Sequence, residues 1–395
     1  MRLAFLLNGL TGYLDAQYRA LHKLGDELLI VTPGSPEASG EAMADTAFTG
    51  LRTEDYAQVL SWNRPPDPAA LVRTVVGFEP DAVFMTSWNY MPAYRAVMKA
   101  VDSRVVRVLI MDNLWRGAPK QWLGRFTHRF FVDPVADVAM VPSDRTEFFA
   151  RRLGFGPADV IRGSLSGDVD LFASGPRTGA ELAGQRRFLS VGRLVVHKGA
   201  DILAESYRAY RAQATDPWDL HVAGIGPLES RLAELPGVTM HGFVQPRRVA
   251  ELMHAASCLV LTSHIEPYGV VLHEAAAAGL PLLCAEFAGA APVFVQDGHN
   301  GWLVPSGDIG AWAQAMARMS ALPADRLASM SEVSRAISRR MSPAGWALHI
   351  HEDIERRIAA GGGRLTARGT RRLAPVNRRR AIMTGPAPER NQGHR

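Results

Sequence analysis

The sequence predicts an α/β fold built from two doubly wound domains. Its 395 residues exceed the length at which one hydrophobic core normally keeps growing, so two domains are expected. Short apolar runs alternate with amphipathic stretches along the chain, which is typical of parallel sheets covered by helices. A polar, glycine-rich stretch from about residue 163 to residue 184 interrupts this alternation. A content of 47% apolar and 21% charged residues favours a globular protein over a fibrous or disordered one.

The first half of the chain contains five runs that are short and apolar enough to be buried strands. The first run, residues 3–7, is too short for the core of a signal peptide and lacks a small-residue cleavage pattern, so we expect a cytoplasmic protein. The remaining runs cover residues 28–32, 82–86, 105–111 and 138–141, and amphipathic stretches predict helices at residues 16–24, 94–101 and 145–153.

The second half repeats the pattern after the glycine-rich stretch. Strands are predicted at residues 188–191, 220–223, 238–241, 259–262 and 282–285, and helices at residues 200–210, 228–235, 249–256 and 270–278. Ligands of doubly wound sheets bind at the carboxyl ends of the strands, so two such domains facing each other would share a site in the cleft between them. The predicted segments are 1–175 and 176–343 for the two domains, 344–360 for a helix after both that packs back on the first domain, and 361–395 for a tail.

Charge is distributed unevenly along the chain. The tail, residues 361–395, carries nine arginines against one glutamate, so it accounts for more than the whole net charge of +5. The domains are therefore not basic, and nucleic acid is not an expected partner. Few apolar residues interrupt the tail, which predicts disorder, although contact with an anionic membrane is an alternative. The two cysteines, Cys258 and Cys284, lie in apolar runs and are expected to be buried thiols.

The segment from Glu266 to Glu274 is the most informative part of the sequence. It lies where a strand ends and a helix begins, and Gly269 leaves the start of that helix uncovered. Free backbone N–H groups and the helix dipole at such a position attract a phosphate, while a nearby carboxylate accepts hydrogen bonds from sugar hydroxyls. Phosphate and sugar at one site indicate a nucleotide sugar.

Two cations follow the first strand of the second half. Arg193 and Lys198 lie in the run from Gly192 to Gly199, at the carboxyl end of a strand, where they can neutralise a leaving diphosphate without a metal ion. The alternative to a diphosphate-binding role is a structural one, in which Arg193 caps a helix and Lys198 is solvated.

Five motifs in a fixed order resemble the retaining family 4 glycosyltransferases, which have the GT-B architecture of two Rossmann-like domains facing each other across a cleft. The resemblance covers residues 1–355. The motifs are Gly192-Arg193-Leu194 with Lys198-Gly199, the run from Val222 to Pro227, Gly242-Phe243-Val244, the pair Glu266 and Glu274, and Asp297-Gly298 with Asn300-Gly301.

The resemblance implies a role for each of these residues. Arg193 and Lys198 would hold the donor diphosphate, and the amides of Gly269, Val270 and Val271 would complete its cradle. Glu274 would bind the ribose hydroxyls. Glu266 would contact the transferred sugar and stabilise its developing positive charge. The backbone of Gly242, Phe243 and Val244 would line the base, and no metal or other cofactor is implied.

The first domain supplies less specific signals. The glycines of the loop that ends at Gly12 would let the backbone approach the donor or the acceptor. The family commonly has a histidine where this chain has Met111, so Asp112 or Asn113 is the substitute expected near the acceptor. A second departure follows Pro292, where Val293 replaces the glutamate often found in the family.

Three features that mimic other sites are interpreted as structural. Asp168 and Asp170 form a DxD triplet of the kind that binds metal elsewhere, but they lie in the interdomain segment. Gly224 and Gly226 begin a dinucleotide fingerprint that lacks its third glycine. His264 has no triad or metal partner in the adjacent sequence.

Residues 120–131 place aromatic side chains at helical spacing among lysine and arginine. Two interpretations compete for this segment. We expect a helix that buries its aromatic face in the first domain, because apolar helix faces are usually buried. The alternative is a basic amphipathic helix that rests on the inner face of a membrane and reaches a lipid-linked acceptor.

The residues and the resemblance together imply a metal-independent, retaining hexosyltransferase that acts in polysaccharide biosynthesis or on a small metabolite. It would move a sugar from a nucleoside diphosphate donor to a hydroxyl of a glycan, a lipid-linked glycan or a metabolite. The resemblance implies that the acceptor attacks on the face from which the diphosphate leaves, with a phosphate oxygen taking the proton. The alternatives are another GT-B enzyme, either a nucleotide-sugar epimerase or a sugar phosphorylase, and a noncatalytic nucleotide-binding scaffold.

Overall fold

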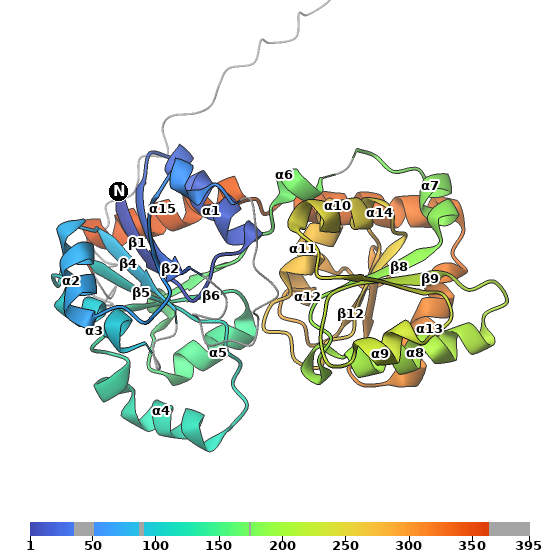
Figure 1. Cartoon of the computed structure of the whole chain (residues 1–395), viewed down its shortest axis with the longest axis horizontal. Helices are drawn as coiled ribbons and strands as arrows, with labels where there is room; N and C mark the ends of the chain where they lie inside the picture. Colours follow the sequence, from blue (N-terminus) through green and yellow to red (C-terminus); the bar gives the residue numbers. More distant parts are fainter. Residues whose placement is uncertain (35–50, 87–90, 174, 363–395) are drawn as a thin grey trace, which may run out of the picture. The chain divides into compact units, whose positions relative to one another are not determined.

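A computed structural model describes residues 1–34, 51–86, 91–173 and 175–362, and within this part the chain forms two wholly parallel sheets flanked by helices (Figure 1). This confirms the predicted fold of two doubly wound α/β domains. Residues 363–395 of the tail lie outside the described residues, so its predicted disorder stays a prediction.

The first sheet has seven strands in the order β3-β2-β1-β4-β5-β6-β7. The chain therefore winds outward from β1 in both directions, with the switch between β1 and β4. The central strands consist almost entirely of buried apolar residues, as expected of strands covered on both faces. The strands are β1 (Arg2–Leu6), β2 (Glu27–Pro33), β3 (Gln58–Trp62), β4 (Ala82–Met85), β5 (Val106–Ile110), β6 (Val138–Val141) and β7 (Val160–Arg162).

The helices of the first domain occupy the connections between these strands. Proline at the first position starts three of them, because its missing N–H is not needed there. The helices are α1 (Gly12–Lys23), α2 (Pro68–Gly77), α3 (Pro92–Ala100), α4 (Pro119–Phe131) and α5 (Asp144–Arg152).

The second sheet has six strands in the order β10-β9-β8-β11-β12-β13, so its switch lies between β8 and β11. Its strands are β8 (Arg187–Val191), β9 (Asp219–Ala223), β10 (Val238–Gly242), β11 (Cys258–Leu261), β12 (Leu282–Ala285) and β13 (Gly301–Val304). The helices from the interdomain segment through the second domain are α6 (Val169–Phe172), α7 (Gly179–Gln185), α8 (Ala200–Gln213), α9 (Glu229–Ala233), α10 (Pro246–His254), α11 (Val270–Ala277), α12 (Ala291–Phe294), α13 (Ile309–Ser320) and α14 (Ala324–Ser338).

The last helix, α15 (Pro343–Ala359), returns to the first domain and lies beside α1 (Figure 1). Trp346, Ile350 and Ile354 are buried against the core that covers one face of the first sheet. Asp26 fixes the helix from the sheet side, because its buried carboxylate accepts from the N-terminal amine at 2.8 Å and contacts His351 Nδ1 at 2.9 Å. The predicted limits of the domains stay predictions.

The expected packing of residues 120–131 is wrong. These residues do form a helix, α4, but none of its side chains is buried, and Phe126 and Phe130 are about three-quarters exposed at 73% and 74%. The helix is held at its ends instead. Gln121 accepts from Arg116 N–H at 2.7 Å and donates to Leu114 O at 2.7 Å. The expectation failed because amphipathic spacing predicts a helix but does not say what covers its apolar face.

Candidate functional site

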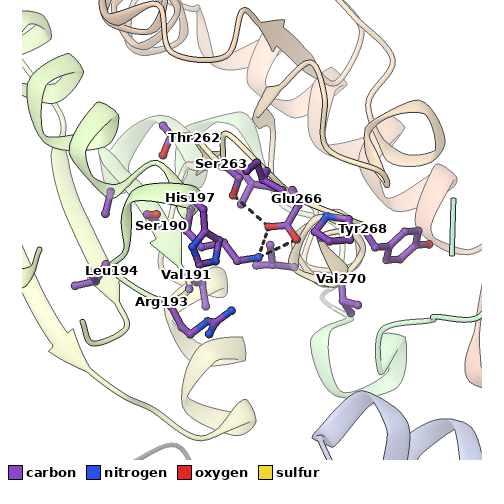
Figure 2. A pocket seen from close by; sticks show the side chains of 18 of the residues that line it. Ser190, Val191, Arg193, Leu194, His197, Thr262, Ser263, Glu266, Tyr268 and Val270 are labelled. Atoms are coloured by element: carbon purple, nitrogen blue, oxygen red, sulfur yellow. Dashed lines mark hydrogen bonds and ion pairs between the residues drawn. The ribbon is translucent and has the colours of Figure 1, made fainter. Parts of the chain in front are cut away.

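The switch between β8 and β11 assembles the candidate site. The loop after β8 carries Arg193 and Lys198, and the loop after β11 carries Glu266 and leads into α11. Because both strands are central and parallel, their carboxyl ends open side by side at the point where crevices form in doubly wound sheets. These loops line a cavity of about 430 Å³ (Figure 2). Tyr13 and Asp112 of the first domain also line it.

Glu266 and Lys198 form the central contact of this cavity. Lys198 Nζ donates to Glu266 Oε1 at 2.9 Å and Oε2 at 2.8 Å, and Ser263 Oγ donates to Oε2 at 3.1 Å, so the hydrogen bonds converge on one carboxylate (Figure 2). The Glu266 side chain is 9% exposed and that of Lys198 is 23% exposed. The solvated alternative for Lys198 is therefore wrong. Two of the three ammonium protons serve Glu266, and one remains for a ligand.

Two glycines hold this pair in position. A Cβ on Gly199 would lie 2.1 Å from Thr262 O, and the residue has a φ of +70°, so the loop after β8 rests directly on the end of β11. Gly269 has a φ of +94°, and a Cβ there would meet Glu266 Cγ at 3.1 Å. Both positions combine close approach with a backbone conformation that favours glycine. Because no side chain caps α11, its first N–H groups face the cavity.

Arg193 differs from Lys198 in its environment. It is exposed at the cavity wall, and among the described residues it has no ion-pair partner. Its loop lies against the next one along the sheet, where a Cβ on Gly224 would approach Gly192 O to 1.8 Å and one on Gly226 would approach Leu194 O to 2.5 Å. Gly224 and Gly226 therefore allow the two loops to pack closely. This packing explains why the chain has the first two glycines of a dinucleotide-binding fingerprint but not the third.

A second cavity of about 330 Å³ adjoins the first and is mostly apolar. The two cavities share Arg193, Val270 and Val271. Phe243, Val244 and Glu274 all line the second cavity. Gly242 lies at the end of β10 with a φ of +64° and does not line either cavity.

Glu274 is the polar group of this second cavity. Burial, together with the nearby charge of Asp168, raises the pKa of Glu274 to about 7. Among the described residues no hydrogen-bond donor meets its carboxylate, so a ligand hydroxyl has no competitor for it. Asp168 caps α6 by accepting from Leu171 N–H at 3.3 Å and also lines the cavity. Burial raises the pKa of Asp168 as well.

His273, next to Glu274, anchors α11 to both connections between the domains. Its Nδ1 accepts from Gly167 N–H at 2.9 Å, so the other ring nitrogen carries the proton and donates to Ser338 O at 3.1 Å. The ring stacks on Phe294 with centroids 4.4 Å apart. Burial lowers the pKa of His273, which favours the neutral form that this arrangement needs.

The structure separates the residues predicted in the first domain. Gly12 lines the second cavity, Asp112 lines the first, and Tyr13 lines both. Burial and Glu266 raise the pKa of Asp112, opposed by Lys198. Asn113 instead lines a different cavity beneath α4. Among the residues that the sequence analysis did not single out, Ser263 and Tyr13 line the first cavity, and His273 supports α11 beside it. Only Tyr13 carried a signal, as the neighbour of Gly12.

The described residues hold no helix long and apolar enough to cross a membrane. Within the same described ranges, no three or more His, Cys, Asp or Glu side chains are grouped closely enough to hold a metal ion.

Comparisons with known proteins agree on the family. Residues 177–336 match the model for glycosyl transferases group 1, and residues 8–162 match that for a glycosyl transferase 4-like domain. WcaL of Escherichia coli (strain K12), named for colanic acid biosynthesis, is 32% identical over 192 residues, which are 45% of this chain and 47% of that protein. The D-inositol 3-phosphate glycosyltransferase of Mycobacterium avium (strain 104) is 32% identical over 187 residues, or 43% of this chain and 42% of the relative. The alignments thus span less than half of either relative.

Solved structures extend the likeness to both domains. The structure of Anabaena HepE with UDP and glucose has a TM-score of 0.68 at 18% identity and covers 90% of this chain and 99% of that one. Sucrose-phosphate synthase from Thermosynechococcus elongatus has a TM-score of 0.67 at 18% identity, with coverage of 91% and 100%. At this identity the likeness concerns the fold.

A protein with two domains of parallel strands, and a polar site where the strand order of the second sheet reverses, has the GT-B architecture. The chain belongs to the family 4-like glycosyltransferases of group 1.

Proposed function

We propose that the protein is a retaining glycosyltransferase that transfers a hexose from a nucleoside diphosphate sugar to a hydroxyl acceptor. The diphosphate would lie between Arg193, Lys198 and the start of α11, with the ribose at Glu274 and the base against Phe243 and Val244. The acceptor oxygen would form a bond to the anomeric carbon as its bond to phosphate breaks, on the same face. The leaving phosphate oxygen would take the acceptor proton.

One observation carries this proposal, the contact between Lys198 and Glu266 beside the uncapped N-terminus of α11. In this contact a carboxylate lies within hydrogen-bond distance of an ammonium, and we propose that the carboxylate serves the sugar and the ammonium the phosphate. The transition state separates a cationic sugar from an anionic leaving group, and a fixed pair of opposite charges can stabilise both ends. Ser263 and Gly269 restrict the carboxylate to one position, so little reorganisation is needed.

We propose that side chains and the helix terminus, rather than a metal ion, neutralise the diphosphate. Arg193 supplies a cation without an ion-pair partner among the described residues, and Lys198 supplies its remaining N–H. Charge-assisted hydrogen bonds of this kind are roughly twice as strong as neutral ones. We further propose that the enzyme acts in the cytoplasm on an acceptor used in polysaccharide biosynthesis.

A melting-temperature screen against nucleoside diphosphates and their sugars, with and without chelator, tests the proposal. Ligands that bind only the native state raise its stability by mass action. The screen should begin with UDP and UDP-glucose, since HepE structures contain them. We expect a rise that survives chelator. A rise that chelator abolishes would contradict metal independence, and no rise with any nucleotide would contradict the donor assignment.

Product analysis then separates transfer from related activities. A glycosyltransferase should consume donor and acceptor together and retain the anomeric configuration. Consumption of free phosphate would indicate a phosphorylase, and an epimerised donor with no acceptor consumed would indicate an epimerase. Nucleotide binding without even slow hydrolysis of the donor would indicate a scaffold.

A further inference from the structure

An exposed aromatic surface on the first domain lies outside the candidate site. We call it the α4 face and define it by five residues of α4 and one of α5. Their side chains are between 41% and 74% exposed. Isolated exposed apolar residues are common, but large aromatic side chains gathered on one helix usually mark an interaction surface. The residues are Trp122, Leu123, Phe126, Phe130, Phe131 and Phe148.

The charge on α4 itself is positive, whereas Asp144 and Glu147 of α5 lie close to Phe148 in the sequence. Between residues 113 and 132 the sequence has four cations and no aspartate or glutamate. Three of the cations, Lys120, Arg125 and Arg129, are exposed on α4 and form no ion pair with any residue that the structure describes. Two copies of this face would bring like charges together, which disfavours a symmetric dimer. An anionic surface would satisfy the unpaired cations.

The helix is built to present this face outward. Gly124 packs against Leu153 on the inner side, where a Cβ would lie 3.6 Å from the leucine. Arg95 donates to Phe131 O at 3.0 Å and holds the last turn. The domain therefore contacts α4 through Gly124, the backbone of Phe131 and the ring of Trp122, which packs on Trp115, while Phe126 and Phe130 stay largely exposed.

We propose that the α4 face docks on an anionic lipid bilayer. Aromatic and leucine side chains would enter the boundary between headgroups and acyl chains, and the flanking lysine and arginine would contact the anionic headgroups. This combination is characteristic of helices that lie in the plane of a membrane. The stems of Lys120, Arg125 and Arg129 are long enough to keep their charges at headgroup level while the rings go deeper.

A groove beneath α4 connects this surface to the candidate site. A cavity of about 580 Å³ is lined by Leu123 and Phe131 at the α4 face and by Arg116 and Pro267, which also line the first cavity of the site. We infer that the acceptor is a lipid-anchored molecule whose hydroxyl reaches the donor along this groove. This inference about the acceptor rests on the proposed function, whereas membrane docking does not.

A dye attached at one position distinguishes docking through α4 from tethering by the basic tail. Cys258 and Cys284 are wholly buried, so a new surface cysteine in the full chain can be labelled selectively. Phe130→Cys places an environment-sensitive dye on the α4 face, and Val76→Cys places the same dye on exposed α2 as the control. Vesicles of phosphatidylcholine, with and without phosphatidylglycerol, are the probes.

We expect a blue shift of the dye at position 130 with anionic vesicles and no shift at position 76. Arg125→Gln with Arg129→Gln should lower vesicle affinity at least about tenfold, because each cation near an anionic surface contributes to binding. Vesicle binding without a shift at position 130 would assign binding to the tail and overturn the proposal, as would equal shifts at both positions. A shift without vesicles that grows with protein concentration would assign the face to a second copy. Nucleotide-induced melting shifts, measured on the same proteins, report separately on the proposed function.

Discussion

Helices α11 and α4 combine polar and apolar residues in opposite ways. In α11 the apolar residues Leu272 and Ala275 are buried in a core, and the ionisable residues His273 and Glu274 are surrounded by it. In α4 the aromatic residues face solvent together with the cations. A buried ionisable group needs either a protein partner or a ligand. His273 has protein partners and Glu274 has none among the described residues, which supports the proposed role of Glu274 in binding a ligand.

The largest effect is expected from Lys198→Ala. Loss of one fixed cation from a preorganised site should lower the transfer rate about 10²–10³-fold. The variant also leaves the buried carboxylate of Glu266 without its partner, which should lower the free energy of unfolding by roughly 1–3 kcal/mol. The rate is measured as nucleoside diphosphate release and the stability by chemical denaturation.

The matched control is Lys198→Met combined with Glu266→Gln. It removes both charges, so stability should return while transfer stays low. Near-normal transfer by Lys198→Ala would show that the pair does not act on the donor.

Leu272 of α11 and Phe126 of α4 differ strongly in burial, so truncating them should have very different effects on stability. Leu272→Ala creates a cavity in a closed core and should cost about 2–5 kcal/mol. Phe126→Ala removes a larger side chain but should change stability by no more than about 0.5 kcal/mol, because the ring is already in water. Denaturation midpoints of the two variants measure the difference. A comparable loss for both would mean that α4 is covered.

His273→Ala should cost about 1–3 kcal/mol, since Gly167 N–H and Ser338 O both lose a buried partner. His273→Gln should recover part of this loss, because an amide can both accept and donate. Thermal melting compares the three proteins. Equal stability of the alanine variant and the unchanged protein would contradict the anchoring role of the imidazole.

A further effect concerns the pH dependence of stability. The pKa of Glu274 is about 7 in the folded protein, above its ordinary value near 4.3, so the native state holds this proton more tightly than the unfolded chain. The contribution of Glu274 to stability is therefore present at low pH and is lost as pH rises toward 7. Glu274→Gln should match the unchanged protein near pH 4.5 and be more stable at pH 8. His273 titrates in both proteins, so its effect cancels in the comparison.

Donor affinity should also depend on the protonation of Glu274, but it should rise with pH where stability falls. An ionised Glu274 accepts hydrogen bonds from ribose hydroxyls better than a protonated one, so donor affinity should increase between pH 6 and pH 8. Isothermal titration with Glu274→Gln should lose this increase. A variant that keeps the full increase would place the titrating group elsewhere.

The sequence predicted those parts of the fold whose residues are uniformly buried. Strands β6 and β12, four apolar residues each, were placed with their observed limits. Strand β3 was missed because it is a partly exposed edge strand with mixed polarity, and β7 because it has only three residues. Helix α14 was missed as well, since its buried positions include serines and an arginine.

The site was predictable to the extent that chain order determines it. Arg193, Lys198, Glu266 and Glu274 follow strands of one sheet, so their convergence follows from topology. The direct pairing of Lys198 with Glu266 did not follow, because it depends on the contact of Gly199 with Thr262, which local sequence does not encode. The exposure of α4 depends on tertiary contacts in the same way.

The central claim, that protein cations hold the donor diphosphate, is tested most directly by calorimetric titration of Arg193→Ala with UDP and with uridine in the presence of chelator. Arg193 is exposed and has no ion-pair partner within the described ranges, so its removal should leave the fold intact, and Arg73→Ala on α2 is the matched control. The account predicts that the preference for UDP over uridine falls at least about tenfold, or 1.4 kcal/mol, in Arg193→Ala alone. An unchanged preference would contradict it.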